Sequence, residues 1–285
     1  MAPTSIGNKQ PPNNERRLKF IMQIFQPVHF ELRKHFERWF SKTDFYNKLY
    51  FHDLAFSSVY GPKLSPRMRD MTFWFCCLGF YGKYFSQFLK TYRSNFVFVD
   101  IGANAGLYSL IAVQNQNCMH SHCFEPDPIT SMFLAKNIEL NCARNISIHR
   151  CAIADEKGQK QVSVNQFHSG SLSLNAPLPP VEHGNVIPID CVNASDLPQI
   201  IPQREQELII KIDVEGYEFV VIGELLKCEF AKHIGHIYFE AGGSKENLKT
   251  SIDLLTKAGF ASLYHSNFFG HKNIHMVRSR KAKPL

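Results

Sequence analysis

The fold of this chain is predicted most directly by one stretch, Phe96-Val-Phe-Val-Asp-Ile-Gly-Ala-Asn-Ala-Gly-Leu-Tyr-Ser109. Its first six residues form an apolar run of the length of a buried strand, and the residues from Leu107 onward have helical character. Gly102 permits a tight turn with close backbone approach, and Gly106 lets the helix begin against the strand. A strand, a glycine loop and a helix in this order predict a doubly wound α/β fold that holds a nucleotide-like ligand at the carboxyl end of the strand.

The same alternation continues toward the C-terminus. Further strands are predicted at 121–125, 146–154, 207–213 and 234–240, and helices at 107–114, 129–141, 218–228 and 245–258. A polar, hairpin-rich stretch reaches to about residue 200, and two last strands lie near 261–265 and 274–278. Strands that alternate with helices predict a mostly parallel sheet covered by helices on both faces.

The N-terminal third has a different character. We expect a disordered tail over 1–16, a helical N-terminal region over 17–95 and a cofactor-binding domain over 96–285. Val28, Leu32 and Phe36 recur at helical spacing between charged residues. Residues 1–95 carry 15 Lys and Arg against 6 Asp and Glu, whereas 96–285 carry 17 against 19. This basic excess favours an anionic partner such as a phosphorylated glycan, a membrane surface or nucleic acid, or else marks a solvated helix face.

Composition places the chain among globular proteins. Hydrophobic residues make up 44% of it, enough for a buried core, so global disorder is excluded. The eight cysteines form no C-x-x-C pair and no zinc-type cluster, which predicts reduced thiols, a cytoplasmic location and no metal site. The first residues are polar and read as a tail rather than a signal peptide, and the apolar stretch Met71–Gly82 is too short to span a bilayer.

Carboxylates stand where two strands end. Asp100 precedes the glycine loop, where it suits the cationic amino group of a methionine moiety and would repel a pyrophosphate. Glu125 ends the second strand and can accept both hydroxyls of a ribose. Asp127, followed by a proline, is typical of a helix N-cap, or else contributes to the ligand site. Ser169-Gly-Ser171 either lines the edge of this site or forms a turn.

The fourth strand carries three ionisable residues at a spacing of two. Lys211, Asp213 and Glu215 would share one face of an extended strand, although central parallel strands are usually apolar. A buried lysine there would keep the carboxylates ionised, and either carboxylate could act as a general base. An ion-paired strand end is the alternative, and a divalent metal held by acidic residues is a lesser one.

The motifs along the chain resemble the FkbM family of methyltransferases in order and spacing. They are the run 100–109, Phe124-Glu-Pro-Asp-Pro128, Ala152-Ile-Ala-Asp155, the most specific piece Lys211-Ile-Asp-Val-Glu-Gly-Tyr-Glu218, and Phe239-Glu240. The resemblance covers about 96–260. It implies a class I methyltransferase fold with a mostly parallel seven-stranded sheet, preceded here by the N-terminal helical extension. It also implies S-adenosylmethionine as donor and usually O-methylation of sugar or natural-product hydroxyls.

The resemblance also assigns residues by position. It implies cofactor contacts for Asp100, Gly102, Asn104, Gly106 and Glu125. Residues Ala152 and Ile153, after the third strand, would lie near the adenine.

Three other functions compete with this interpretation. A nicotinamide-dependent oxidoreductase could use a similar loop, but no tyrosine is followed by a lysine four residues later, so the short-chain dehydrogenase dyad is absent. A non-catalytic module with a basic N-terminal surface is disfavoured because the cofactor motifs are intact. Nucleic-acid N-methyltransferases carry an Asp/Asn-Pro-Pro-aromatic element where this chain has Asp213-Val-Glu-Gly-Tyr217. We therefore expect a small-molecule or glycan acceptor rather than nucleic acid, with peripheral membrane contact through the basic helices as a further possibility.

Overall fold

A computed structural model describes residues 55–68, 70–80, 83–164, 169–174, 185–202, 206–241, 244–268 and 271–279. The predicted tail over 1–16 and the amphipathic pattern of Val28, Leu32 and Phe36 lie outside the described residues. All described elements belong to one compact unit, Asp53–Leu285.

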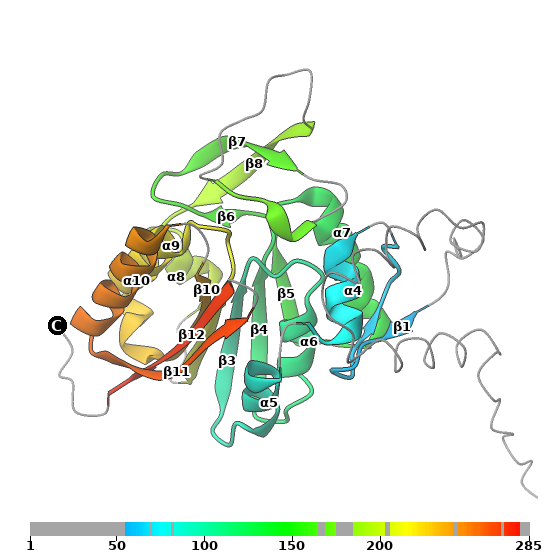
Figure 1. Cartoon of the computed structure of the whole chain (residues 1–285), viewed down its shortest axis with the longest axis horizontal. Coiled ribbons are helices and arrows are strands. Elements are labelled where there is room, and N and C mark those ends of the chain that lie inside the picture. Colours follow the sequence, from blue (N-terminus) through cyan, green and yellow to red (C-terminus); the bar gives the residue numbers. More distant parts are fainter. Residues whose placement is uncertain are drawn as a thin grey trace, which may run out of the picture. The chain divides into compact units, whose positions relative to one another are not determined.

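A seven-stranded sheet organises this unit, with the strand order β11-β12-β10-β9-β3-β4-β5 (Figure 1). Neighbouring strands are parallel except for β12, which is antiparallel to both β10 and β11. The strands are β3 (Phe96–Ile101), β4 (Cys118–Phe124), β5 (Ile146–His149), β9 (Glu207–Ile212), β10 (Ile234–Ala241), β11 (Phe260–Phe268) and β12 (His271–Arg278). The predicted mostly parallel sheet of the class I methyltransferase fold is confirmed.

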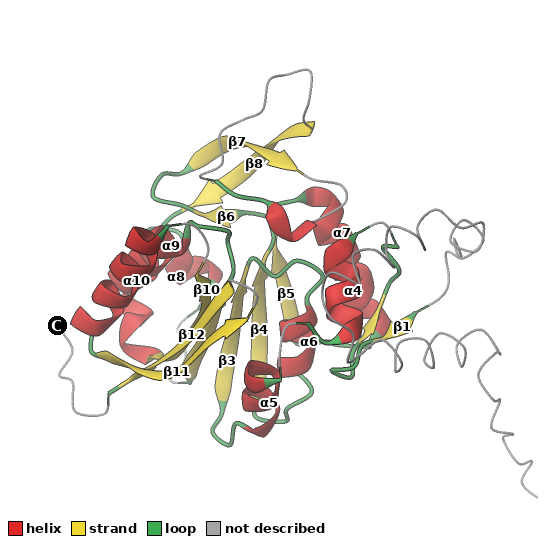
Figure 2. Ribbon diagram, in the orientation of Figure 1, coloured by secondary structure: helices red, strands yellow, loops and turns green. Residues whose placement is uncertain are grey.

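Helices cover both sides of this sheet (Figure 2). Those predicted after the glycine loop all form, within two residues of the expected bounds: α6 (Leu107–Ala112), α7 (Pro128–Leu140), α9 (Glu218–Lys227) and α10 (Lys245–Lys257). Shorter helical segments are α8 (Leu197–Ile200), η1 (Ser169–Ser171) and η2 (Glu229–His233).

The largest hydrophobic core lies along the central strands. Every residue of β3 is buried, and all of β9 except its first residue is buried as well. Apolar side chains of these strands pack with those of β10 and α9. Asp100 on β3 and Lys211 on β9 are direct neighbours in this ladder, so two charged side chains lie within an otherwise apolar layer.

The prediction of one continuous strand over 146–154 was wrong. The chain leaves the main sheet after β5, and β6 (Ala152–Ile153) pairs instead with β8 (Asn185–Val192). Together with β7 (Gly158–Val164) they form a three-stranded sheet in the order β6-β8-β7, seen at the top of Figure 1. The break occurs because the strand partner changes at 150–151, which local sequence does not encode.

Residues 55–95 were predicted to be helical, but the described ones form two short strands as well as two helices. A two-stranded pair, β1 (Phe56–Ser57) and β2 (Lys63–Leu64), precedes α4 (Met71–Leu78) and α5 (Tyr84–Thr91). Asp70 caps α4 by accepting a hydrogen bond from the Thr72 N–H. Among the described residues, no helix is long and apolar enough to cross a membrane.

Candidate functional site

A pocket lies where the carboxyl ends of β3, β4 and β9 meet β6. Its empty volume, which includes space open to solvent, is about 670 Å³. Its lining combines apolar side chains with a few polar groups. The lining residues are Ile101, Gly102, Asn104, Phe124, Glu125, Pro126, Cys151, Ala152, Ile153, Ser169, Gly170, Leu172, Leu174, Asp213, Val214 and Tyr217.

Gly102 forms the tight turn at the end of β3. Its φ of 72° is left-handed, and a Cβ at this position would lie 1.9 Å from the carbonyl oxygen of Asp213. The Gly102 and Ala103 N–H groups both donate to the Phe124 carbonyl at 3.0 Å. The loop is therefore fixed against the ends of two neighbouring strands, and only glycine fits there.

Gly106 and Asn104 lie in the same loop, but only Asn104 lines the pocket. Gly106 has a φ of 78°, and a Cβ would approach Leu134 Cδ1 on α7 to 2.2 Å, so this glycine allows close packing behind the pocket rather than lining it. Asn104, at a φ of 49°, does line the pocket. Its backbone N–H donates to Glu125 Oε2 at 2.8 Å, which joins the loop to the end of β4.

Glu125 is the central carboxylate of the pocket. Its Oε1 accepts from the Asp127 N–H at 3.0 Å, while Oε2 accepts from Asn104. Burial raises the pKa of Glu125 to about 7, although the two backbone N–H groups lower it in part. A carboxylate oxygen that accepts one hydrogen bond can accept another. The two oxygens can therefore receive the paired hydroxyls of a ribose.

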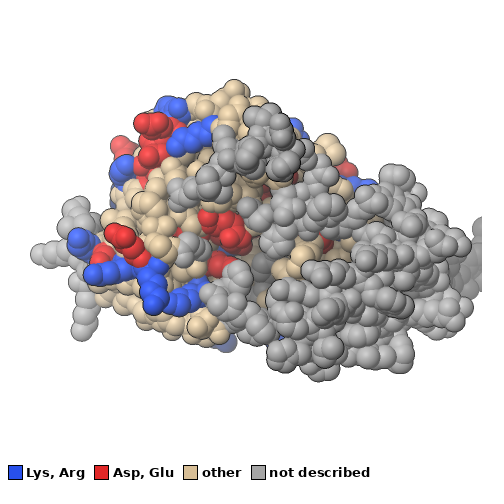
Figure 3. Space-filling model, turned by 45° about the horizontal axis from the view of Figure 1, so that its top comes forward, with Lys and Arg blue, Asp and Glu red and all other residues tan. Residues whose placement is uncertain are grey.

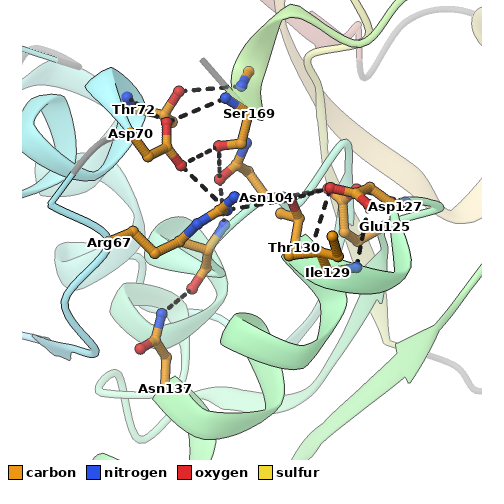
Figure 4. Close-up of polar contacts among 12 residues, drawn as sticks. Arg67, Asp70, Thr72, Asn104, Glu125, Asp127, Ile129, Thr130, Asn137 and Ser169 are labelled. Carbon is orange, nitrogen blue, oxygen red and sulfur yellow. Dashed lines mark hydrogen bonds and ion pairs between the residues drawn. The ribbon is translucent and has the colours of Figure 1, made fainter. Parts of the chain in front are cut away.

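The structure separates the other predicted cofactor residues. Ala152 and Ile153, which were predicted to lie near the adenine, line the pocket from β6. Asp127 is not among the lining residues. Its carboxylate instead accepts from the N–H groups of Ile129 and Thr130 at 3.1 and 3.2 Å, so it serves as the N-cap of α7 (Figure 4).

Asp100 lies beneath the loop and not in the pocket, which corrects the expectation that it faces the ligand. Its Oδ2 accepts from the Ser109 N–H and hydroxyl at 3.2 and 2.8 Å. Lys211 Nζ lies 3.3 Å from Asp100 Oδ1 and 3.4 Å from Asp213 Oδ2, and donates to the Gly102 carbonyl at 2.8 Å. The register of β3 with β9 places Asp100 beside Lys211, and such pairing is not visible in sequence.

Lys211 is likewise a buried partner rather than a lining residue. Burial lowers the pKa of its amine, but the carboxylates of Asp213 and Asp100 outweigh burial and raise the pKa above its ordinary value. The lysine therefore stays charged beneath the pocket. It donates to the loop carbonyl and forms ion pairs with both aspartates.

Asp213 reaches the pocket, and Glu215 does not. Burial raises the pKa of Asp213 to about 6, Lys211 lowers it, and Glu240 raises it. Its side chain is 23% exposed. β9 ends at Ile212, and Glu215 adopts a left-handed φ of 51°, so the alternation that would have placed both carboxylates on one face stops before Glu215. Its carbonyl accepts from the Ser173 hydroxyl at 2.6 Å.

Several lining residues were not predicted. Leu172 and Leu174 reach the pocket from the residues after η1, which carry no recognisable motif. Ser169 was expected either at the pocket edge or in a turn, and it is in both places. Tyr217 lines the pocket and donates from its hydroxyl to Asp155 Oδ1 at 2.7 Å, which connects α9 to the small sheet.

The lining suits an adenosyl ligand. Phe124, Ile153 and Leu172 provide apolar surface for a flat ring, Glu125 provides acceptors for hydroxyls, and the glycine turn lets backbone approach closely. Within the described part of the chain, no group of three or more His, Cys, Asp or Glu side chains is arranged to hold a metal ion.

Comparisons with known proteins identify a family for this chain. The family described as the methyltransferase FkbM domain matches residues 100–262, more than half of the chain. "Methyltransferase 1" of Beauveria bassiana (strain ARSEF 2860) is 25% identical over 178 residues, which are 57% of this chain and 71% of that protein.

The solved structures that the chain matches include two methyltransferases. Precorrin-6y C5,15-methyltransferase of Geobacter metallireducens GS-15 is 13% identical with a TM-score of 0.40, covering 69% of this chain and 86% of its own. TrmK of M. capricolum, in complex with S-adenosyl-homocysteine, is 12% identical with a TM-score of 0.43, covering 72% of each chain. With its family match over the glycine loop, Glu125 and Asp213, the chain belongs to the FkbM methyltransferase family and uses S-adenosylmethionine as its methyl donor.

Proposed function

We propose that this methyltransferase acts on oxygen, at a hydroxyl of a small-molecule or glycan acceptor, with Asp213 as the general base. The observation that carries the proposal is the place of Asp213, a carboxylate in the pocket wall with Lys211 beneath it. A pKa of about 6 leaves Asp213 mostly ionised at neutral pH yet more basic than an ordinary aspartate.

The chain's own groups divide the work. Bound S-adenosylmethionine supplies a methyl group that its sulfonium has already activated. Gly102, Asn104 and Glu125 hold the ligand, and correct orientation of two reactants can supply ~7–11 kcal/mol. Asp213 Oδ takes the proton from the acceptor hydroxyl, a step worth about 10²–10⁴-fold in rate. Lys211 keeps that carboxylate charged until the proton arrives.

Asp213→Asn tests the base. We expect turnover to fall at least about tenfold, because an amide cannot accept the proton, while affinity for S-adenosylhomocysteine stays within about twofold. Asp253→Asn, an exposed carboxylate on α10, is the matched control and should keep full turnover. Unchanged turnover in Asp213→Asn would remove Asp213 from the chemistry.

The choice of oxygen is tested separately with methyl-labelled S-adenosylmethionine. Matched acceptors that differ only in the nucleophile, such as a sugar, its amino sugar and its thio sugar, should receive label in the hydroxyl compound as a methyl ether. Label found on the amine or thiol alone would contradict O-methylation. This result would leave the methyltransferase activity itself unaffected.

The setting of the reaction is also part of the proposal. All eight cysteines are free and seven are buried, which supports a reducing, cytoplasmic compartment. On the described part of the face in Figure 3, basic and acidic side chains form separate small groups rather than one basic surface. The preference for a small-molecule or glycan acceptor over nucleic acid rests on the sequence, which has Asp213-Val-Glu-Gly-Tyr217 where nucleic-acid N-methyltransferases carry an Asp/Asn-Pro-Pro-aromatic element. Membrane contact through the basic N-terminal helices rests on the sequence pattern alone.

A further inference from the structure

A polar network connects the segment 65–72 to the cofactor pocket, although this segment precedes the family match at 100–262. Asp70 is 3% exposed. Its Oδ1 accepts from the Ser169 N–H at 3.1 Å, and its Oδ2 accepts from the Ser169 hydroxyl at 2.6 Å (Figure 4). Because Ser169 lines the pocket, a buried charge on the segment holds one pocket wall directly.

Ser169 transmits this contact to the glycine loop. Asn104 Nδ2 donates to Ser169 Oγ at 3.0 Å, and the backbone N–H of the same asparagine donates to Glu125. Asp70, Ser169, Asn104 and Glu125 therefore form one chain of hydrogen bonds through three lining residues. A second contact runs in parallel, since the Gly170 N–H donates to Thr72 Oγ1 at 3.1 Å.

The segment 65–72 also contacts α7, which in turn bonds to the glycine loop. Arg67 Nη1 lies 3.1 Å from Asp70 Oδ2 and donates to Thr130 Oγ1 on α7 at 3.2 Å. The Ser65 N–H donates to Asn137 Oδ1 at 2.6 Å, and Asn137 Nδ2 donates to the Ala105 carbonyl at 2.8 Å. Two separate routes, through Ser169 and through Asn137, thus connect residues of 65–72 to the glycine loop.

We propose that Asp70 is a positioning residue of the cofactor site, which holds Ser169 against Asn104 and so preorganises the pocket for the adenosyl ligand. Hydrogen bonds to a buried carboxylate are short and directional, so they fix Ser169 before ligand binds. Fixing the walls in advance reduces the ordering cost of binding. The inference concerns the cofactor alone and is independent of the acceptor.

A purely structural role for Asp70 is the alternative, because its Oδ1 also accepts from the Thr72 N–H at 3.0 Å and caps α4. Asn is as good an N-cap as Asp. Asp70→Asn therefore keeps the cap but removes the charge that faces Ser169 Oγ and Arg67. Only a positioning role predicts weaker ligand binding by this variant.

The experiment is a double-mutant cycle on the full chain, with S-adenosylhomocysteine affinity measured by calorimetry. We expect Ser169→Ala and Asp70→Asn each to weaken binding about five- to tenfold, because each removes the bond from the Ser169 hydroxyl to Asp70 Oδ2. The alanine lacks the donor, and the asparagine amide has no second acceptor oxygen. The affinity of the double variant should be within about twofold of that of the single variant that binds less tightly, since both changes remove the same contact. Ser244→Ala removes the cap of α10, at Asn247 N, and should bind like wild type.

Two results would overturn the inference. One is S-adenosylhomocysteine binding within about twofold of wild type by both single variants, and the other is a double variant whose losses simply add. Ser169→Ala removes a single hydroxyl and leaves the α4 cap intact, so wild-type binding by this variant alone overturns the inference even if Asp70→Asn is unstable. If the folded wild-type protein does not bind S-adenosylhomocysteine, the cofactor assignment fails together with this inference.

Discussion

At the level of single residues, two opposing effects set the pKa of Glu125. It is 6% exposed, so burial favours the neutral acid, yet two backbone N–H groups point at its oxygens and favour the carboxylate. Burial prevails, and the pKa rises to about 7. Ribose hydroxyls donate to the charged form, so a bound ligand stabilises the carboxylate form of Glu125 beyond what the two backbone N–H groups provide.

This balance predicts a pH dependence of binding. As pH falls from about 8 to about 6, Glu125 gains a proton and loses its capacity to accept two hydroxyls, so wild-type affinity for S-adenosylhomocysteine should fall. Glu125→Gln should bind more weakly at about pH 8 and should show a flatter pH profile. Calorimetry across this range is the measurement. Tighter binding by wild type on acidification would show that the neutral acid is the binding form.

At the scale of the element, β9 carries the charged centre of the sheet. Lys211 projects from a strand that is buried nearly throughout and meets Asp100 on β3 and Asp213 just beyond its own end. It also donates to the carbonyl of Gly102, so one amine ties β9 to the loop after β3. The ion pairs are therefore part of how these two strands position the loop.

Removing this amine should be strongly destabilising. Lys211→Met leaves two carboxylates without their cation, and breaking a buried pair in this way costs ~3–5 kcal/mol of unfolding free energy. Lys157→Met is the matched control, because Lys157 is 52% exposed in its pair with Asp196 and such pairs contribute about 1 kcal/mol or less. Denaturant titration of both variants measures the difference. Equal losses would show that the Lys211 cluster contributes no more than a surface pair.

At the scale of the whole molecule, the pocket depends on the sheet order. Lining residues come from the ends of β3, β4, β6 and β9 and from the loop at Ser169, which are widely separated in sequence. No single element forms the site, so ligand binding and folding of the unit at Asp53–Leu285 are linked.

S-adenosylhomocysteine should therefore raise the melting temperature of the chain. At a ligand concentration about 100 times the Kd, binding adds about 2.7 kcal/mol, which is roughly 5–10 °C for a domain of this size. NAD(H) at the same concentration should have no effect. Stabilisation by NAD(H) and none by S-adenosylhomocysteine would favour a nicotinamide enzyme on the same fold. A thermal unfolding scan with each ligand distinguishes the two.

Much of the site was predictable because its signals are local. The apolar run 96–101, the turn at Gly102 and the acid that directly follows β4, Glu125, each depend on residues adjacent in the chain. Left-handed φ values and strand-length apolar runs leave direct traces in sequence. The glycine loop and most strand and helix bounds followed from these signals, and the cofactor class followed from the resemblance to the FkbM family.

Other features required the tertiary structure, because they depend on which strands and loops become neighbours. Strand register turned Asp100 toward Lys211 and away from the pocket, and a change of pairing partner divided 146–154 into β5 and β6. The contact between Asp70 and Ser169 joins residues 99 positions apart. Sequence by itself determined the local turns and the alternation that make this fold, whereas the three-dimensional packing decided which carboxylates meet the ligand and which support the loop.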